Sequence, residues 1–280
     1  MKILHNEPLS KYTTIRIGGT AENLYFPQTT EELIEITQQF GLEYIIGGGS
    51  NLLINDEKVF PNVICLTEFN KTIKKDENDV YTVGSGVRLQ TLIQAINSDG
   101  FGGIEYLYSV PGLVGGAIVM NAGRGRNYGK TISDYVISVQ VLKDNKVVSI
   151  EKEKCEFKHR SSIFKNSDYI VLSVELKFPV QDRSESEKLR KERIQLCKDH
   201  QDNSCPNFGS VFKDSSGAIM KFVKKIGLKR GKVRFSKKTM NWILKDRDGT
   251  FRDAVKAINA VKKMHGLIGK KAECEVIIWE

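Results

Sequence analysis

The stretch that decides the fold runs from residue 102 to residue 129 and reads GGIEYLYSVPGLVGGAIVMNAGRGRNYG. Its glycines are too frequent for one continuous helix or strand, and its apolar residues are too numerous for a loop that faces solvent. Pro111-Gly112 and Gly115-Gly116-Ala117 leave backbone N–H groups unobstructed, and Asn121 adds a fixed amide. We expect this segment to pack closely against something flat.

A second glycine cluster lies upstream, where the apolar run 44–46 leads into Gly47-Gly48-Gly49-Ser50-Asn51. Backbone N–H groups without side chains around them can cradle a pyrophosphate, although a glycine triplet between strands is more often a tight turn. Neither cluster matches the G-x-G-x-x-G fingerprint or a Walker loop. The two loops together therefore predict a dinucleotide that is bound in some other manner.

The rest of the chain alternates short strands and helices, which predicts an α+β protein. Thr29 and Glu32 fit a capping box, Gly41 fits the end of that helix, and Thr250 fits the cap of another. We expect strands at 13–17, 44–46, 80–83, 136–142, 170–178 and 275–279, and helices at 29–41, 89–96 and 251–264. A charged helix should follow the polar boundary 181–186 and reach about residue 200, and one more helix should end near 227. A length of 280 residues favours two or three packed units, with divisions at 1–67, 68–180 and 181–280.

The net charge of +9 is unevenly placed, with nine Lys or Arg and no acid between Lys221 and Lys238. An anionic partner is implied, and a nucleotide diphosphate fits better than nucleic acid because RNP-like aromatics and a helix-turn-helix signature are absent.

No stretch has the length of a membrane span, and the first residues lack the apolar core of a signal peptide, so we expect a cytoplasmic protein without a membrane partner. The five scattered cysteines predict reduced, structural thiols, and the four histidines predict no metal site.

Five motifs, in order along the chain, resemble those of the UDP-N-acetylenolpyruvoylglucosamine reductase (MurB) family. They are TTIRIGG at 13–19, GGGSNLL at 47–53, PGLVGGA at 111–117, RSSIF at 160–164 and PNFGSVFK at 206–213. The resemblance runs from about residue 8 to residue 279. Five ordered motifs are far more specific than any one of them.

This resemblance implies an FAD-binding fold of the vanillyl-alcohol-oxidase (PCMH) type made of subdomains 1–67 and 68–180, with an α+β substrate domain at 181–280. It implies an oxidoreductase that passes hydride from NADPH through non-covalent FAD to the enolpyruvyl group of a UDP-linked amino sugar, giving UDP-N-acetylmuramate for peptidoglycan. The short chain resembles the form of the family without an extra substrate loop, and we expect a monomer.

The resemblance also implies roles for particular residues. Ser210 matches the family's proton donor, Arg160 matches the arginine that binds the enolpyruvyl carboxylate, and Glu275 matches the catalytic glutamate. Glu273 is the alternative to Glu275, since both would lie on the same face of a strand. The implied substrate-binding residues are Asn207 and Lys213, and the implied cofactor-binding residues are Gly47, Gly48, Gly49, Ser50, Asn51, Leu52, Pro111, Gly112, Gly115, Gly116 and Ala117.

The chain departs from the family pattern at His159, Phe208, Thr239 and the longer loop 121–129. These departures leave two alternatives open, namely an FAD oxidoreductase acting on a different substrate and a non-enzymatic module that binds nucleotide or nucleic acid. A side chain at Gly48 or Gly115 is expected to lower flavin content by occupying space meant for the cofactor.

Overall fold

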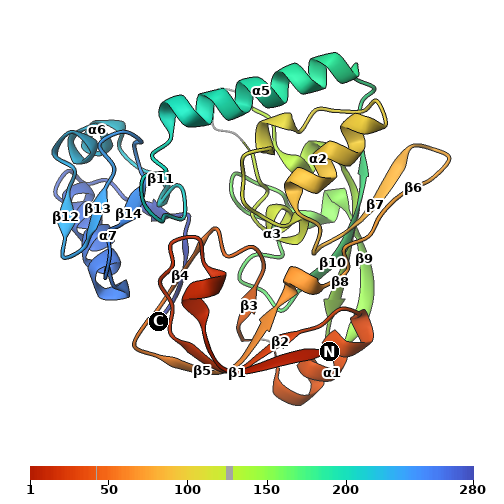
Figure 1. The fold of residues 1–280 in the computed structure, drawn as a ribbon, viewed down its shortest axis with the longest axis horizontal. Coiled ribbons are helices and arrows are strands. Elements are labelled where there is room, and N and C mark those ends of the chain that lie inside the picture. The colour runs from red at the N-terminus through yellow and green to blue at the C-terminus, as the bar shows by residue number, and fades with distance from the viewer. Residues whose placement is uncertain (42, 124–128) are drawn as a thin grey trace. The chain divides into compact units, whose positions relative to one another are not determined.

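The computed structural model describes residues 1–41, 43–123 and 129–280, and its contacts divide the chain into two compact units (Figure 1). Unit 1 comprises residues 1–3, 24–48 and 62–197, and unit 2 comprises residues 4–23, 49–61 and 198–280. The glycine cluster is thus shared, because Gly48 belongs to unit 1 and Gly49 to unit 2. The three-part division at residues 67 and 180 stays a prediction, since contacts in a finished fold do not show which segments fold independently.

A five-stranded antiparallel sheet is the centre of unit 1. Its strands, in spatial order, are β6 (Ile73–Lys75), β7 (Val80–Gly84), β10 (Ile170–Lys177), β8 (Val136–Lys143) and β9 (Lys146–Glu151). The central strand β10 is buried on both faces, which is why its sequence is an almost continuous apolar run. In the middle of the sheet, Val174 pairs with Val83 on one side and Val139 on the other.

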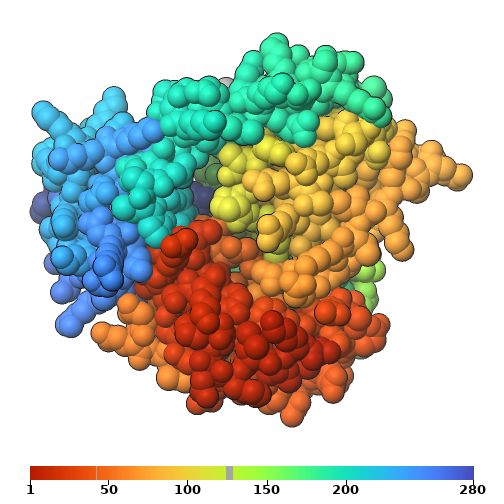
Figure 2. Space-filling view, viewed as in Figure 1, coloured from red at the N-terminus to blue at the C-terminus, as the bar shows by residue number. Residues whose placement is uncertain are grey.

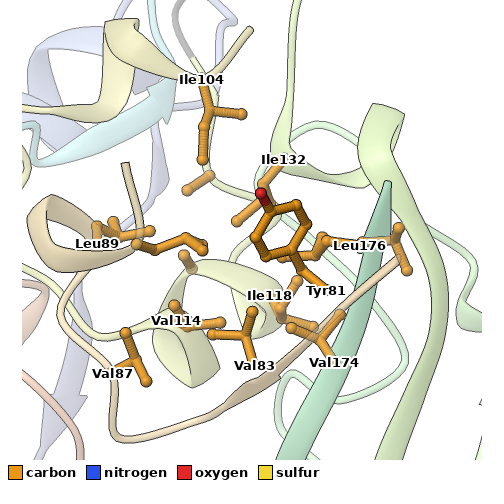
Figure 3. Close-up of a cluster of buried hydrophobic side chains, with 14 of the residues drawn as sticks. Tyr81, Val83, Val87, Leu89, Ile104, Val114, Ile118, Ile132, Val174 and Leu176 are labelled. Carbon is orange, nitrogen blue, oxygen red and sulfur yellow. The ribbon is translucent and has the colours of Figure 1, made fainter. Parts of the chain in front are cut away.

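Helices α2 (Leu89–Ser98) and α3 (Val114–Val119) contribute to the main core of unit 1. Figure 3 shows side chains from these helices meeting the side chains of β7 and β10. Leu89 and Val114 are fully buried there together with Val83. Burial of each such side chain contributes about 1.5–3 kcal/mol. The glycine-rich stretch is therefore held by apolar packing on both sides of its glycines.

A second core of unit 1 forms around helix α1 (Thr30–Phe40). The predicted cap is confirmed: Thr29 accepts a hydrogen bond from the Glu32 N–H at 3.3 Å, and Gly41 ends the helix with a φ of 77°. Buried Leu33 and Ile36 pack against strands of unit 1. The other elements that lie in this unit or extend into it are β1 (Lys2–Pro8), β2 (Thr20–Phe26), β3 (Ile45–Ile46), β5 (Val59–Cys65), η2 (Leu66–Glu68), η3 (Glu105–Leu107), η4 (Ile132–Tyr135), η5 (Lys152–Cys155) and α5 (Arg183–His200).

Unit 2 combines a small antiparallel sheet with two helices and with segments from the start of the chain. Its elements are η1 (Leu9–Tyr12), β4 (Leu52–Ile54), β11 (Phe212–Asp214), α6 (Gly217–Ile226), β12 (Lys229–Arg230), β13 (Val233–Phe235), β14 (Ile243–Lys245), α7 (Phe251–Gly266), β15 (Glu273–Cys274) and β16 (Ile277–Trp279). Ile15, Ile17 and Leu53 are buried in the same core as the α7 residues Ile258 and Val261. The predicted cap of α7 is confirmed, since Thr250 accepts from the Asp253 N–H at 3.2 Å.

One predicted strand is wrong, and another begins two residues later than predicted. Residues 13–17 form a turn, because Arg16 has a φ of 57° and its N–H donates to the Thr13 carbonyl, although Ile15 and Ile17 are buried as a strand pattern suggests. The predicted strand 275–279 is confirmed over β16 (Ile277–Trp279), but Glu275 and Val276 lie outside any strand, between β15 and β16. Both pairings that cause this break involve residues more than 50 positions away along the chain.

All five cysteines are free thiols, in agreement with their predicted structural role. Burial raises the pKa of Cys65, and it raises the pKa of Cys155 to about 11, so both remain protonated near neutral pH. In the described part of the chain, no helix combines the length and hydropathy needed to cross a membrane.

Candidate active site

The first half of the glycine cluster lies against the Pro111–Leu113 turn within unit 1. A Cβ added to Gly48 would be 3.1 Å from both the Gly112 Cα and the Pro111 carbonyl oxygen. At Gly47 the same atom would meet only the Leu113 side chain, at 3.9 Å. Gly48 thus lets two backbone segments approach each other, while Gly47 leaves its backbone open on one side.

Two adjacent glycines at the start of α3 have opposite surroundings. Gly115 donates its N–H to the Ser85 carbonyl at 2.9 Å, and an added Cβ would be 2.8 Å from the Ser85 Cβ. Gly116 is exposed, and nothing lies within 4 Å of an added Cβ. The structure therefore changes the reason expected for substitutions at Gly48 and Gly115: the new methyl group would meet the protein itself.

Unit 1 offers two buried hydroxyls, Ser85 beside Gly115 and Ser109 two residues before Pro111. Within the described residues, neither Ser85 Oγ nor Ser109 Oγ has a hydrogen-bond partner, and both atoms are inaccessible to solvent. A buried hydroxyl without a partner costs about 1–3 kcal/mol, so a polar ligand group at this position would offset a penalty. Together with the open backbone at Gly47 and Gly116, the donor set fits a dinucleotide such as FAD.

The second half of the cluster belongs to unit 2, where Gly49 has a φ of 60° and a Cβ would overlap the Tyr12 carbonyl. The Gly49 carbonyl accepts from the Thr14 N–H at 3.1 Å, which connects the 13–19 and 47–53 motifs. Ser50 is half-buried and Leu52, the first residue of β4, is buried. Only glycine meets both the conformational and the spatial demand at position 49.

The segment around Ser210 is held by two asparagines. Asn207 accepts from the Gly209 N–H and donates to the Cys205 carbonyl, each at 3.1 Å. Asn241 accepts from the Phe212 N–H at 3.1 Å and donates to the Phe212 carbonyl at 2.7 Å, and its own carbonyl accepts from the Val211 N–H at 2.9 Å. Ser210 itself is half-buried. Asn241 belongs to no motif of the sequence-based prediction, although asparagine is a recognisable residue for a left-handed turn before a strand.

Glu275 is the point where two of the five motifs meet the C-terminal segment in unit 2. Its N–H donates to the Val211 carbonyl at 2.8 Å, and its carbonyl accepts from Asn51 Nδ2 at 3.1 Å. The next strand, β16, runs parallel to β4, with the Ile277 N–H donating to the Asn51 carbonyl at 3.0 Å. Backbone hydrogen bonds therefore place Glu275 next to the residue that follows Ser210 and next to the glycine cluster.

The same geometry separates Glu275 from Glu273. Glu273 lies in β15, is exposed, and forms an ion pair with Lys213 of the opposite strand at 2.5 Å. Glu275 is half-buried and lies outside both strands. The expectation that the two carboxylates share one face of a continuous strand is wrong, because the strand ends between them.

Arg160 lies in unit 1, in a tight turn where it has a φ of 53° and is half-buried. Lys158 and Ser161 exchange backbone hydrogen bonds across the turn, and Asn121 donates to the Lys158 carbonyl at 3.1 Å. Ser162 donates to the Val119 carbonyl at 2.8 Å. These contacts attach the Arg160 turn to the end of α3, so the RSSIF motif and the glycine-rich stretch form one local structure.

The residues that depart from the family pattern have different surroundings. Phe208 is 3% exposed and belongs to the core of unit 2, so its bulk fills that core. Thr239 donates to the His200 carbonyl and accepts from the Asp202 N–H, whereas His159 is exposed. Positions 124–128 of the longer loop lie outside the described residues. Among the residues that the structure does describe, no group of three or more His, Cys, Asp or Glu could hold a metal ion.

Comparison with known proteins gives the class first. Residues 21–149 match the FAD binding domain family. The structure of 6-hydroxy-D-nicotine oxidase from Arthrobacter nicotinovorans shares the fold, with a TM-score of 0.50 and 14% identity over 64% of this chain and 42% of that one. This protein is therefore a flavoprotein with the predicted α+β, FAD-binding fold of the vanillyl-alcohol-oxidase type, and that prediction is confirmed.

Two further likenesses extend over nearly the whole chain. The UDP-N-acetylenolpyruvoylglucosamine reductase of Thermotoga sp. (strain RQ2) is 32% identical over 98% of this chain and 92% of its own length. The crystal structure of the reductase (MurB) from Thermus caldophilus has a TM-score of 0.82 and 28% identity, covering 100% of this chain and 98% of that one. The chain belongs to the UDP-N-acetylenolpyruvoylglucosamine reductase family.

Proposed function

We propose that this protein is an NADPH-dependent reductase that converts the enolpyruvyl ether of UDP-N-acetylglucosamine into UDP-N-acetylmuramate for peptidoglycan synthesis. The observation that carries the proposal is the arrangement at Glu275, where the glycine cluster, the Ser210 segment and the C-terminal strand meet through backbone hydrogen bonds. Family membership supports the same reaction. We also propose a cytoplasmic monomer that supports cell-wall growth, shape and division.

Non-covalent FAD would supply hydride chemistry, accepting hydride from NADPH and passing it to the substrate. Within this chain, backbone N–H groups of the Gly47–Asn51 and Pro111–Ala117 loops, with the Ser85 and Ser109 hydroxyls, would hold it. Neither loop contains a histidine or cysteine that could form a covalent link. Acid precipitation is therefore expected to release the flavin into the supernatant, and flavin retained in the pellet would contradict this.

The chain's own side chains would complete the reaction at the substrate. Ser210 would donate its hydroxyl proton to the enol carbon, and Glu275 would act as a proton relay or as a polarising partner of the enol. The planar guanidinium of Arg160 would bind the substrate carboxylate with two parallel hydrogen bonds, as lysine cannot. Asn207 and Lys213 would contribute to binding the nucleotide sugar.

Anaerobic half-reactions test this function. NADPH should reduce the bound flavin, and enolpyruvyl UDP-N-acetylglucosamine should reoxidise it in a second, separable step followed by flavin absorbance. A reduced enzyme that only another enolpyruvyl compound reoxidises would support the divergent oxidoreductase. A colourless protein that cannot be reconstituted with FAD would exclude both enzymes and leave the binding module.

A further inference from the structure

The positive charge of this protein is concentrated in one part of unit 2. Residues 198–280 contain nineteen Lys or Arg and nine Asp or Glu, so this part carries more positive charge than the +9 of the whole chain. The basic stretch Lys221–Lys238 includes α6 and β12–β13. The diphosphate of a UDP-linked substrate would use only one or two of these cations, so the proposed reaction leaves most of this charge unexplained.

The same region exposes large apolar side chains at two places. On α6, Phe222 is 53% exposed and Ile226, one turn later, is 43% exposed. After α7, Leu267 is 88% exposed and Ile268 is 53% exposed. The opposite side of α6 is anchored in the core of unit 2 by buried residues, so these exposed side chains are not needed for packing.

The start of α6 and the end of α7 are joined directly. The backbone N–H of Ser216, the residue that caps α6, donates to His265 Nε2 at 2.8 Å, and the His265 ring is fully buried. His265 Nδ1 is 2.8 Å from the Val261 carbonyl, which orients the ring. Both apolar pairs therefore belong to one structural unit, the α6–α7 pair, whose relative position is set by a buried hydrogen bond.

Exposed lysines lie close to these apolar side chains in the sequence. Lys221 and Lys225 are exposed on α6, and Lys270 and Lys271 follow Ile268. Within the described residues none of these four forms an ion pair, whereas Lys188 and Lys191 on α5 pair with neighbouring glutamates. The space-filling view shows the blue-coloured, C-terminal part of the chain at the molecular surface (Figure 2). The exposed apolar side chains of α6 and of residues 267–268 are thus each close in sequence to lysines that form no ion pair with any described residue.

We propose that the surface formed by α6 and residues 267–271 binds the anionic face of a lipid bilayer. Lysines would neutralise lipid phosphates while the apolar side chains enter the boundary between headgroups and acyl chains. Duplex nucleic acid would use the lysines but would leave four exposed apolar side chains in contact with polar phosphate. This proposal departs from the sequence-based expectation of no membrane partner, which rested on the absence of a spanning helix and of a signal peptide; peripheral binding requires neither.

Vesicle co-sedimentation of the full-length protein tests the proposal. We expect binding to vesicles of equal parts phosphatidylcholine and phosphatidylglycerol, weakening as salt is raised, and little binding to phosphatidylcholine alone. Lys221→Gln with Lys225→Gln should weaken binding about 25-fold, since each lysine near an anionic leaflet contributes about fivefold. Phe222→Gln with Ile226→Gln should weaken it at least about tenfold.

Matched control variants lie on α5. The double variant Lys188→Gln with Lys191→Gln removes the same charge. The variant Ile194→Gln removes an apolar side chain that is 38% exposed. Both variants should bind vesicles as the wild type does. Circular dichroism and flavin reduction by NADPH should be unchanged in every variant. The proposal is overturned by absent vesicle binding, by equal binding to both kinds of vesicle, by wild-type binding of either α6 variant, or by equal losses in the controls. Duplex DNA that displaces the protein from vesicles through the same lysines, with no role for Phe222 and Ile226, also overturns it.

Discussion

Two parts of the candidate site are built on opposite principles. The glycine cradle comprises Gly47–Gly49 and Gly115–Gly116, and the Glu275 crossing comprises Asn51, Val211 and Glu275 with the hydrogen bonds that join them. In the cradle, packing excludes side chains, so that Gly48 and Gly115 touch other parts of unit 1 while Gly47 and Gly116 stay open. At the crossing, the contacts that place the two segments are backbone groups of Glu275 and of the residue after Ser210, so they do not depend on which side chains stand at positions 210 and 275. The comparison teaches that substitutions in the cradle act on stability and cofactor binding, and that side-chain changes at the crossing act on reactivity.

The largest effect is expected at the crossing, from Ser210→Ala. Flavin content and reduction by NADPH should be retained, because neither needs a proton donor to the enol carbon. Reoxidation by the enolpyruvyl substrate should slow about a hundredfold to ten-thousandfold. Stopped-flow traces of flavin absorbance measure both steps, and reoxidation at the wild-type rate would show that Ser210 is not the donor.

The next largest effect is expected at Gly49, the first residue of the glycine cluster that belongs to unit 2. Gly49→Ala combines a left-handed backbone with overlap of the Tyr12 carbonyl, so the free energy of unfolding should fall by about 2–5 kcal/mol. Urea titration followed by circular dichroism measures the loss. Gly41→Ala is the matched control, because it has a positive φ but nothing within 4 Å of the added methyl group. Equal losses in the two variants would show that backbone conformation, and not overlap, decides the effect.

A smaller effect should separate the two glutamates at the crossing. Glu275→Gln should slow reoxidation by substrate about tenfold to a hundredfold, because it removes a charge next to the proton path. Glu273→Gln should change this rate less than about twofold and stability by less than about 1 kcal/mol, since it loses only a partly exposed ion pair with Lys213. The reverse ranking would assign the catalytic role to Glu273.

The smallest effects should distinguish the adjacent glycines of α3. Gly115→Ala should lower the free energy of unfolding by about 1–3 kcal/mol through contact with Ser85. Gly116→Ala should leave the stability of the flavin-free protein within about 0.5 kcal/mol while weakening FAD binding measured by fluorescence titration. Unchanged FAD affinity in the Gly116 variant would place the cofactor elsewhere.

The sequence by itself determined the local elements. The caps at Thr29, Gly41 and Thr250 and the strands around Val83, Val139 and Val174 were predictable, because capping and apolar periodicity depend on residues only a few positions apart. The ordered motifs also determined the family and the flavin-binding fold. The roles of Arg160, Ser210 and Glu275 stay predictions that the experiments above address.

The contacts between segments that are far apart in the sequence could be known only from the tertiary structure. In the structure the glycine cluster is divided between two units, residues 13–17 form a turn and not the predicted strand, and β15 ends before Glu275. The end of β15 depends on hydrogen bonds between segments far apart in sequence, such as Asn51 with Glu275 and Val211 with Glu275. The 13–17 turn combines the local Arg16–Thr13 hydrogen bond with a distant one from the Thr14 N–H to the Gly49 carbonyl. A local pattern cannot reveal these partners, because strand pairing and loop contacts are chosen by the packing of the whole unit.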